Sequence, residues 1–125
     1  MAELDHMILN VADPAASLRF YQEVLEFRPE GRTGPFHVLR VNPGLTLDLL
    51  DAPPAQRLHL AFRVDAARFE RIVARLRERD IPFGGQHADR SGSPPQPAQG
   101  AFGLAASCYF EDPDGHYLEI RLPPT

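Results

Sequence analysis

Cysteine is almost absent from the sequence, because Cys108 is the only one among 125 residues. A single thiol cannot form a disulfide within the chain, and it excludes a zinc site built from several cysteines. A chain without internal disulfides suits a reducing compartment, so we expect a cytoplasmic protein.

Long apolar runs and an excess of positive charge are also lacking. The N-terminus, Met-Ala-Glu-Leu-Asp-His, has neither the basic start nor the apolar run of a signal peptide, and no apolar run approaches membrane-spanning length. The net charge of −4 argues against a surface for nucleic acid or for an anionic membrane, because both require concentrated positive charge. We therefore expect neither of them as a partner.

The length and composition are those of one globular domain. A chain of 125 residues can bury a core but is too short for two independent domains. Its 43% hydrophobic and 24% charged residues are ordinary values for a globular protein, which argues against a disordered chain. We expect a single domain over residues 1–125.

The strongest local signal lies near the C-terminus. Residues 112–115, Asp-Pro-Asp-Gly, are typical of a turn, and they are flanked by alternating apolar and polar residues, which predicts a β-hairpin. In the outgoing strand Leu118 and Ile120 face one way and Glu119 faces the other. A carboxylate among large residues in mid-strand is costly unless a cation or a donor meets it, so Glu119 is a candidate functional residue.

The first half of the chain predicts one helix and three strands. Asp13 followed by Pro14 is typical of a helix start, with Asp as the N-cap and Pro at the first helical position. Gly31, Gly34 and Pro35 indicate a loop. The expected elements are a strand at 4–11, a helix at about 14–26, and strands at 36–41 and 45–50.

The second half begins in the same way. Residues 58–64 alternate like a strand, and Asp65 precedes a helix with an apolar stripe. Residues 84–104 are rich in Gly, Pro, Ser and Gln, which predicts a long loop that is either a functional lid or disordered. Strands at 105–110 and 117–122 complete this half.

The two halves are an internal repeat. When they are laid over one another, His6 falls on His59 and Asp48 falls on Glu119. Each half reads as a βαβββ unit, so we expect an α+β fold in which two modules, about 1–53 and 57–125, form an open, curved mixed sheet.

Four ionisable residues occupy equivalent strands, each on the face opposite the aliphatic stripe: His6, Asp48, His59 and Glu119. If the modules curve into an open barrel, these side chains converge on its concave side. Two imidazoles and a carboxylate suit a first-row divalent metal and leave coordination positions open for a substrate.

Three stretches carry a resemblance to a known family: the strand with His6 ahead of Val-Ala-Asp-Pro, the strand with His59, and residues 110–120 with Glu119. Together they resemble the vicinal oxygen chelate superfamily, which includes glyoxalase I, extradiol dioxygenases, fosfomycin resistance proteins and bleomycin resistance proteins. The resemblance implies that His6, His59 and Glu119 bind a divalent ion such as Fe²⁺, Mn²⁺, Ni²⁺ or Zn²⁺. It also implies a small substrate that chelates the ion through neighbouring oxygens, and commonly a homodimer.

The resemblance to individual branches is less complete. Glyoxalase I uses a further carboxylate from its first module, and Asp48 stands in that place as a fourth ligand or a base. Ser107 and Tyr109 match the Ser-x-Tyr of fosfomycin transferases. However, six residues after Glu119 leave no tail for the Arg of those enzymes, and Ile8 replaces their Thr, so a fosfomycin enzyme is not expected.

Extradiol dioxygenases share the triad and add a His and a Tyr near the iron. Loose candidates for these are His37, His87, Tyr109 and Tyr117.

Two arginines flank the ligand candidates on the polar face. Arg63 and Arg121 either hold an anionic substrate through paired N–H donors or pair with a carboxylate. Tyr117 shares the face of Glu119 and is a candidate for lining the pocket, together with Ser107 and Tyr109. His116, beside the turn glycine, is expected to brace the hairpin, and Cys108 to lie in the core.

Two functions are consistent with these residues. The first is a metal-dependent lyase, isomerase or dioxygenase: an isomerase would use Asp48 or Glu119 as its base, whereas ring opening requires Fe²⁺ or Mn²⁺. The alternative is a metal-free protein that binds a drug or another small molecule, as bleomycin resistance proteins do, since an acidic chain suits a cationic ligand. A site retained without turnover is a third reading. A homodimer is expected in each case because the modules leave sheet edges that need covering.

Overall fold

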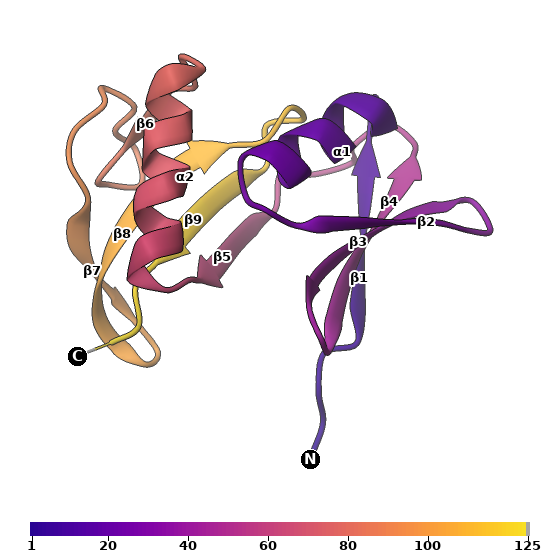
Figure 1. Ribbon diagram of the computed structural model, residues 1–125, viewed down its shortest axis with the longest axis horizontal. Coiled ribbons are helices and arrows are strands. Elements are labelled where there is room, and N and C mark those ends of the chain that lie inside the picture. Colours follow the sequence, from indigo (N-terminus) through magenta and orange to yellow (C-terminus); the bar gives the residue numbers. More distant parts are fainter. Residues whose placement is uncertain (125) are drawn as a thin grey trace. The chain divides into compact units, whose positions relative to one another are not determined.

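The structure is a computed structural model and describes residues 1–124 (Figure 1). The chain divides into two compact units, one up to Gln56 and the other from Arg57 onward. Each unit contains one helix and its own mixed β-sheet, of four strands in the first unit and five in the second. The predicted α+β class with two βαβββ-type modules is therefore confirmed. Among the described residues, neither helix is long and apolar enough to cross a membrane.

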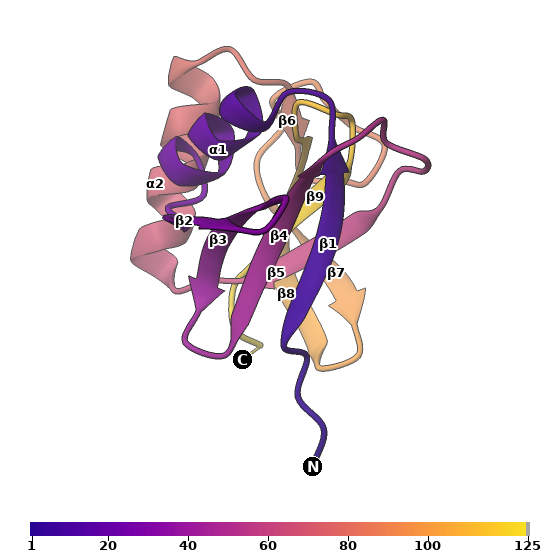
Figure 2. The same cartoon turned by 90° about the vertical axis from the view of Figure 1, so that its right-hand side faces the viewer.

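The first unit follows the predicted order. Its elements are β1 (His6–Val11), α1 (Pro14–Glu23), β2 (Arg28–Thr33), β3 (Phe36–Asn42) and β4 (Leu45–Asp51). The sheet order is β1-β4-β3-β2, and β1 lies parallel to β4 (Figure 2). Asp13 caps α1 as predicted, because its Oδ1 accepts a hydrogen bond from the Ala16 N–H at 3.2 Å.

The core of the first unit lies between the sheet and α1. The stripe of β1 and β4 predicted to face inward is buried, and Tyr21 of α1 stacks on Phe27 with ring centroids 5.9 Å apart. The buried residues of the two strands are Leu9, Val11, Leu47 and Leu49. The opposite face of β1 carries His6 and Ile8, which are exposed.

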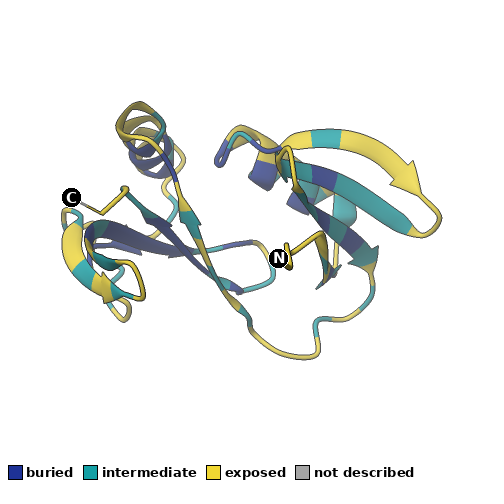
Figure 3. Ribbon diagram, turned by 90° about the horizontal axis from the view of Figure 1, so that it is seen from below, coloured by how far each residue is buried: buried dark blue, intermediate teal, exposed yellow. Residues whose placement is uncertain are grey.

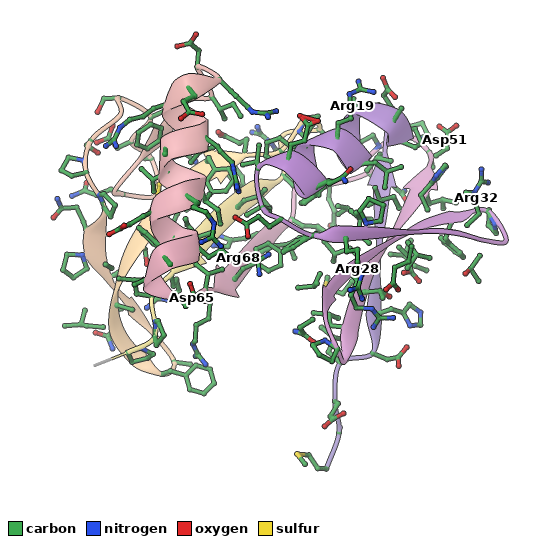
Figure 4. The ribbon with its side chains drawn as sticks, in the orientation of Figure 1. Arg19, Arg28, Arg32, Asp51, Asp65 and Arg68 are labelled. Carbon is green, nitrogen blue, oxygen red and sulfur yellow. The ribbon has the colours of Figure 1, made fainter. Side chains whose placement is uncertain are left out.

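The second unit is built in the same way around a longer helix. Its elements are β5 (His59–Arg63), α2 (Ala66–Glu78), β6 (Phe83–Gly84), β7 (Gln96–Gly100), β8 (Gly103–Glu111) and β9 (Tyr117–Arg121). The sheet order is β5-β9-β8-β6. β7 also pairs with β8, along residues 103–107, whereas β6 pairs with residues 109 and 110 of the same strand. Asp65 caps α2 by accepting from the Arg68 N–H at 2.8 Å, and Figure 4 shows both residues at the start of this helix.

The apolar stripe predicted for α2 is buried against this sheet, and the three middle residues of β9 are buried as well; Figure 3 colours the ribbon by burial. The stripe consists of Phe69, Ile72, Val73 and Leu76.

Two predicted loops are correct only in part. Gly34 and Pro35 form the predicted turn between β2 and β3, but Gly31 lies within β2, which extends to Thr33. The register of β2 shifts between Pro29 and Arg32, and Gly31 sits there with φ of +84°, so the strand passes through a bulge that glycine permits.

The second of these predictions is the long loop at 84–104. Its last part forms β7, which pairs antiparallel with β8 through a tight turn at Gly100 and Gly103. Pro97 masks this strand in the sequence, but proline is tolerated because β7 is an edge strand. The part before β7 is held by its own hydrogen bonds, such as that from the Gly85 N–H to Ser93 Oγ at 3.0 Å.

Cys108 lies in the core, as predicted, with no exposed surface. Burial raises the pKa of its thiol to about 11. Since the thiolate is the reactive form, we expect Cys108 of the folded protein to resist a disulfide reagent at pH 7 and to react fully in denaturant. Absorbance of the released thiol reports both conditions, and fast reaction of the folded protein would contradict the buried position.

Candidate functional site

The polar face of the second sheet is set by the register of β5 against β9. These strands run parallel, with His59 opposite Tyr117, Ala61 opposite Glu119, and Arg63 opposite Arg121. Because paired residues project to the same face, these six side chains share one side of the sheet. Leu118 and Ile120 point to the other side and are fully buried.

The turn before β9 fixes this register. The Tyr117 N–H donates to the Leu58 carbonyl at 2.8 Å, and the Leu58 N–H donates to Nδ1 of His116 at 3.0 Å. Arg57 Nε donates to the carbonyl of Gly115 at 2.8 Å. His116 therefore braces the hairpin as predicted, and it ties the start of β5 to the start of β9.

Glu119 is buried, and each of its two carboxylate oxygens lies beside a basic side chain. Its Oε2 accepts from Arg121 at 2.8 Å, and its Oε1 lies 3.0 Å from Nε2 of His59. Burial raises the pKa of Glu119, but hydrogen bonds from Arg121, His59 and Ser107 outweigh that effect, so the pKa is below its usual value. Glu119 is thus an ionised carboxylate at neutral pH.

Arg121 also anchors the β7–β8 hairpin. Its second terminal nitrogen donates to the carbonyls of Ala98 at 2.9 Å and Gly103 at 3.2 Å. The guanidinium of Arg121 thus donates both to Glu119 and to this hairpin. Of the two readings of Arg121 left open by the sequence, the structure shows the ion pair with a carboxylate.

Two rings contact the imidazole of His59, and one of them contacts a third ring. His87 stacks on it with centroids 5.6 Å apart and 11° between the planes, and Tyr109 meets it edge-on at 6.5 Å. The ring centroid of His87 also lies 5.9 Å from that of Tyr109 and 5.4 Å from that of Tyr117. The sequence marked His87 only as a loose candidate, because nothing in its spacing shows that the segment before β7 folds back over β5 and β9.

The remaining predicted pocket residues of this unit lie on β8 and β9. Tyr109 and Ser107 are buried on β8 and both interact with Glu119. Burial and then the charge of Glu119 raise the pKa of Tyr109, so its hydroxyl keeps its proton at neutral pH. The hydroxyl of Tyr117 accepts from Arg57 at 2.9 Å, and the guanidinium of Arg57 lies 4.7 Å from the centre of the Tyr117 ring.

His6 and Asp48 lie in the first unit, on the polar face of its sheet. Asp48 is paired with Ile8, and His6 is paired with Thr46. The hydrogen bond of His6 to Asp5, at 2.8 Å, is the main cause of its raised pKa, and the charge of Asp48 adds to it. Asp48 itself accepts from Thr46 Oγ1 at 2.8 Å.

The structure thus brings together two of the three predicted ligands, His59 and Glu119, within one unit. His6 belongs to the other unit, so the complete triad stays a prediction, as do the roles of Asp48 as ligand or base. Over residues 1–124, neither unit by itself holds a group of three His, Cys, Asp or Glu side chains close enough for one metal ion.

A pocket of about 320 Å³ opens beside Glu119, toward the β7–β8 hairpin. Arg63 lies in its wall with its guanidinium 4.7 Å from the ring centre of Phe102. The pocket is lined by Ala61, Arg63, Gln99, Gly100, Ala101, Phe102, Glu119, Arg121, Leu122 and Pro124.

Comparisons with known proteins agree with this fold. A family model described as the Glyoxalase/Bleomycin resistance protein/Dioxygenase superfamily matches residues 3–120. The structure named "Oxidase ChaP-H1" is 32% identical over 99% of this chain and 98% of its own, with a TM-score of 0.81. "Oxidase ChaP-H2" is 31% identical over 98% and 94%, with a TM-score of 0.82. A glyoxalase/dioxygenase from Nostoc punctiforme is 26% identical over 98% and 92%, with a TM-score of 0.73.

Proposed function

The chain belongs to the glyoxalase/bleomycin resistance protein/dioxygenase superfamily, that is, the vicinal oxygen chelate group, and on that basis we propose that it is a metal-dependent enzyme. In this proposal His6, His59 and Glu119 hold a divalent ion, and the substrate is a small molecule with neighbouring oxygens. The observation that carries the proposal is the pair formed by His59 Nε2 and Glu119 Oε1, 3.0 Å apart at the centre of the polar face.

This pair fits a metal ion. Two ligand atoms at right angles around an ion, with bonds of about 2.1 Å, lie about 3 Å apart. The separation of 3.0 Å between Nε2 and Oε1 matches that spacing. The imidazole of His59 is 42% exposed, so an ion can reach it.

The other groups of the site hold the ligands and the substrate in place. Arg121 binds the second oxygen of Glu119 and thereby leaves Oε1 facing His59. The ring of His87 stacks on the face of the His59 ring and restricts the rotation of that ring. Tyr109, with its pKa raised, keeps a hydroxyl proton that it can donate to a bound oxygen.

The bound ion would supply Lewis acidity, by which charge that develops on the two substrate oxygens is stabilised. We favour an oxidative reaction over isomerisation because two relatives above 30% identity are named oxidases. An oxidation in which O₂ is the oxidant and binds at the ion would need a redox-active ion, which favours Fe²⁺ or Mn²⁺ over Zn²⁺. For an isomerase, Asp48 or Glu119 would be the base.

The metal-free binding alternative is less well supported by the charges of the second unit. A cationic drug needs a free carboxylate, but Glu119 is already paired with Arg121. The adjacent pocket carries Arg63 in addition. We propose further that the two units form one domain, 1–125, and that the protein is a cytoplasmic homodimer.

Metal content tests this proposal. We expect protein purified without an affinity tag and loaded with Fe²⁺ or Mn²⁺ to retain one ion per chain, and the variants His6→Ala and His59→Ala to lose it. His37→Ala is the matched control, since His37 pairs with Leu49 of the inward-facing stripe. Elemental analysis after gel filtration measures the outcome. Retention of the ion by His6→Ala would remove His6 from the ligand set, and no ion in the wild-type protein would favour the binding protein.

A further inference from the structure

The pocket between Arg63 and the β7–β8 hairpin has the character of a site for a flat anion. We propose that it binds the carboxylate end of an aromatic acid, with Arg63 as its partner and Phe102 against its ring. The inference rests on the proposed function in that the opposite end of the same molecule would carry the neighbouring oxygens that meet Glu119.

The size and lining of the pocket suit an aromatic ring. Its volume of about 320 Å³ lies at the lower end of the range of small-molecule pockets, roughly 300–1,000 Å³. Ala61 stands between Glu119 and Arg63 on this face, and its small side chain leaves the floor of the pocket open. Leu122 and Pro124 add apolar surface.

The charge of the pocket favours an anion. The carboxylate of Glu119 is already matched by Arg121, which is held in place by two carbonyls of the hairpin. Among residues 1–124 Arg63 forms no ion pair with an acidic side chain, and its guanidinium lies over the ring of Phe102. A guanidinium in this setting has its N–H donors available for a carboxylate, which it can bind in a bidentate manner.

Phe102 supplies the aromatic surface. It lies in the two-residue turn between β7 and β8 and is 76% exposed, which is unusual for a large apolar side chain. Because a planar ring packs well on an aromatic face, an exposed phenylalanine beside an arginine suits a ligand that is both flat and acidic.

The spacing along β5 and β9 sets the length of the ligand. Arg63 and Arg121 are one register pair, and Ala61 and Glu119 are the pair two residues earlier. Arg63 and Glu119 are diagonal neighbours, about 6.6 Å apart along the strands and about 4.8 Å across them, so their backbones are about 8 Å apart. This separation is comparable to the distance across a benzene ring from a carboxylate to oxygens on the far side. A benzoic acid that carries adjacent hydroxyl groups opposite its carboxylate therefore matches both ends of the site.

The test compares an acid with its neutral amide in the absence of metal. With EDTA present, we expect wild-type protein to bind 3,4-dihydroxybenzoate about tenfold more tightly than 3,4-dihydroxybenzamide in calorimetric titrations. Arg63→Gln should remove this preference by weakening binding of the acid alone. Phe102→Leu should weaken both ligands by a similar factor.

Arg32→Gln is the matched control, because Arg32 lies on β2 in the first unit (Figure 4) and its recorded hydrogen bond goes to the carbonyl of Gly34. This variant should keep the tenfold preference. Equal binding of acid and amide by the wild type, no binding of either, or an unchanged preference in Arg63→Gln would each overturn the inference. The binding assay does not depend on the metal. If the wild-type protein showed no preference for the acid but retained its ion in the metal assay, the carboxylate site would be refuted and the proposed function would stand.

Discussion

Replacement of Glu119 by glutamine is expected to abolish retention of a divalent ion while the protein stays folded. The change removes the negative charge from the centre of the site and keeps its shape. Groups outside the coordination sphere are already worth about 10- to 100-fold in metal affinity, so loss of a ligand should weaken binding by roughly a hundredfold or more. Metal content after gel filtration, as for the histidine variants, measures the effect.

Glu111→Gln is the matched control for this variant. Glu111 lies on the neighbouring strand β8 and pairs with Arg90 at 2.9 Å, so the same substitution removes a carboxylate from an arginine pair of the same unit. We expect Glu111→Gln to retain the ion. Loss of the ion in both variants would mean that the metal responds to general destabilisation and not to Glu119 as a ligand.

Glu119→Gln should also lower the stability of the protein, by an amount that depends on pH. The carboxylate of Glu119 is stabilised by Arg121 and His59 and has a lowered pKa, so its contribution is present above the ordinary pKa of a glutamate, about 4.3, and is lost as the pH falls through the folded-state value. In metal-free buffer we expect Glu119→Gln to cost about 1–3 kcal/mol of unfolding free energy at pH 7. That cost should shrink below about pH 4. An unchanged cost in acid would argue against an ionised Glu119.

Asp112→Ala is expected to destabilise the protein by about 2–4 kcal/mol, because it leaves backbone donors of the turn without a partner. The Oδ1 atom of Asp112 accepts from the N–H groups of Asp114 and His116, each at 2.9 Å. Both the Asp112 side chain and the His116 ring are buried, so water cannot replace these bonds without opening the turn. Urea unfolding followed by circular dichroism measures the change.

Asp112→Asn is the conservative control, since its side-chain oxygen still accepts from both N–H groups, and we expect it to cost less than about 1 kcal/mol. Asp112→Ala should also weaken metal retention, because the turn sets the register that brings His59 to Glu119 through His116 and Leu58. Equal stability of the two variants would show that the turn does not depend on this side chain.

Local signals in the sequence are sufficient for most elements of the fold. Asp13 and Asp65 cap the two helices because a short polar side chain can accept from the N–H groups of the first turn wherever the helix lies. Alternation places Glu119 opposite Leu118 and Ile120 because successive side chains of a strand always point to opposite faces. These outcomes depend on neighbours a few residues away.

Partners far apart along the chain were not predictable in the same way. β7 was hidden because Pro97 and its glycines read as a loop, and only pairing with β8 makes the segment a strand. His87 reaches His59 because the segment before β7 folds over the sheet. Arg121 lies only two residues from Glu119, but whether it binds a substrate or that carboxylate depends on how the distant carbonyls of Ala98 and Gly103 hold its guanidinium.

By itself, the sequence determined the α+β class, the repeated module and the residue types of the candidate site, since strand period and turn chemistry are local properties of the chain. Only the tertiary structure decided that Arg121 pairs with Glu119, that His87 stacks on His59 and that the guanidinium of Arg63 lies over the ring of Phe102. The physical reason is that these contacts depend on the register and folding of distant segments. His59 and Glu119 are 60 residues apart, and Arg121 is held beside Glu119 by carbonyls 18 and 23 residues away, so the contact energies are absent from any short stretch of sequence.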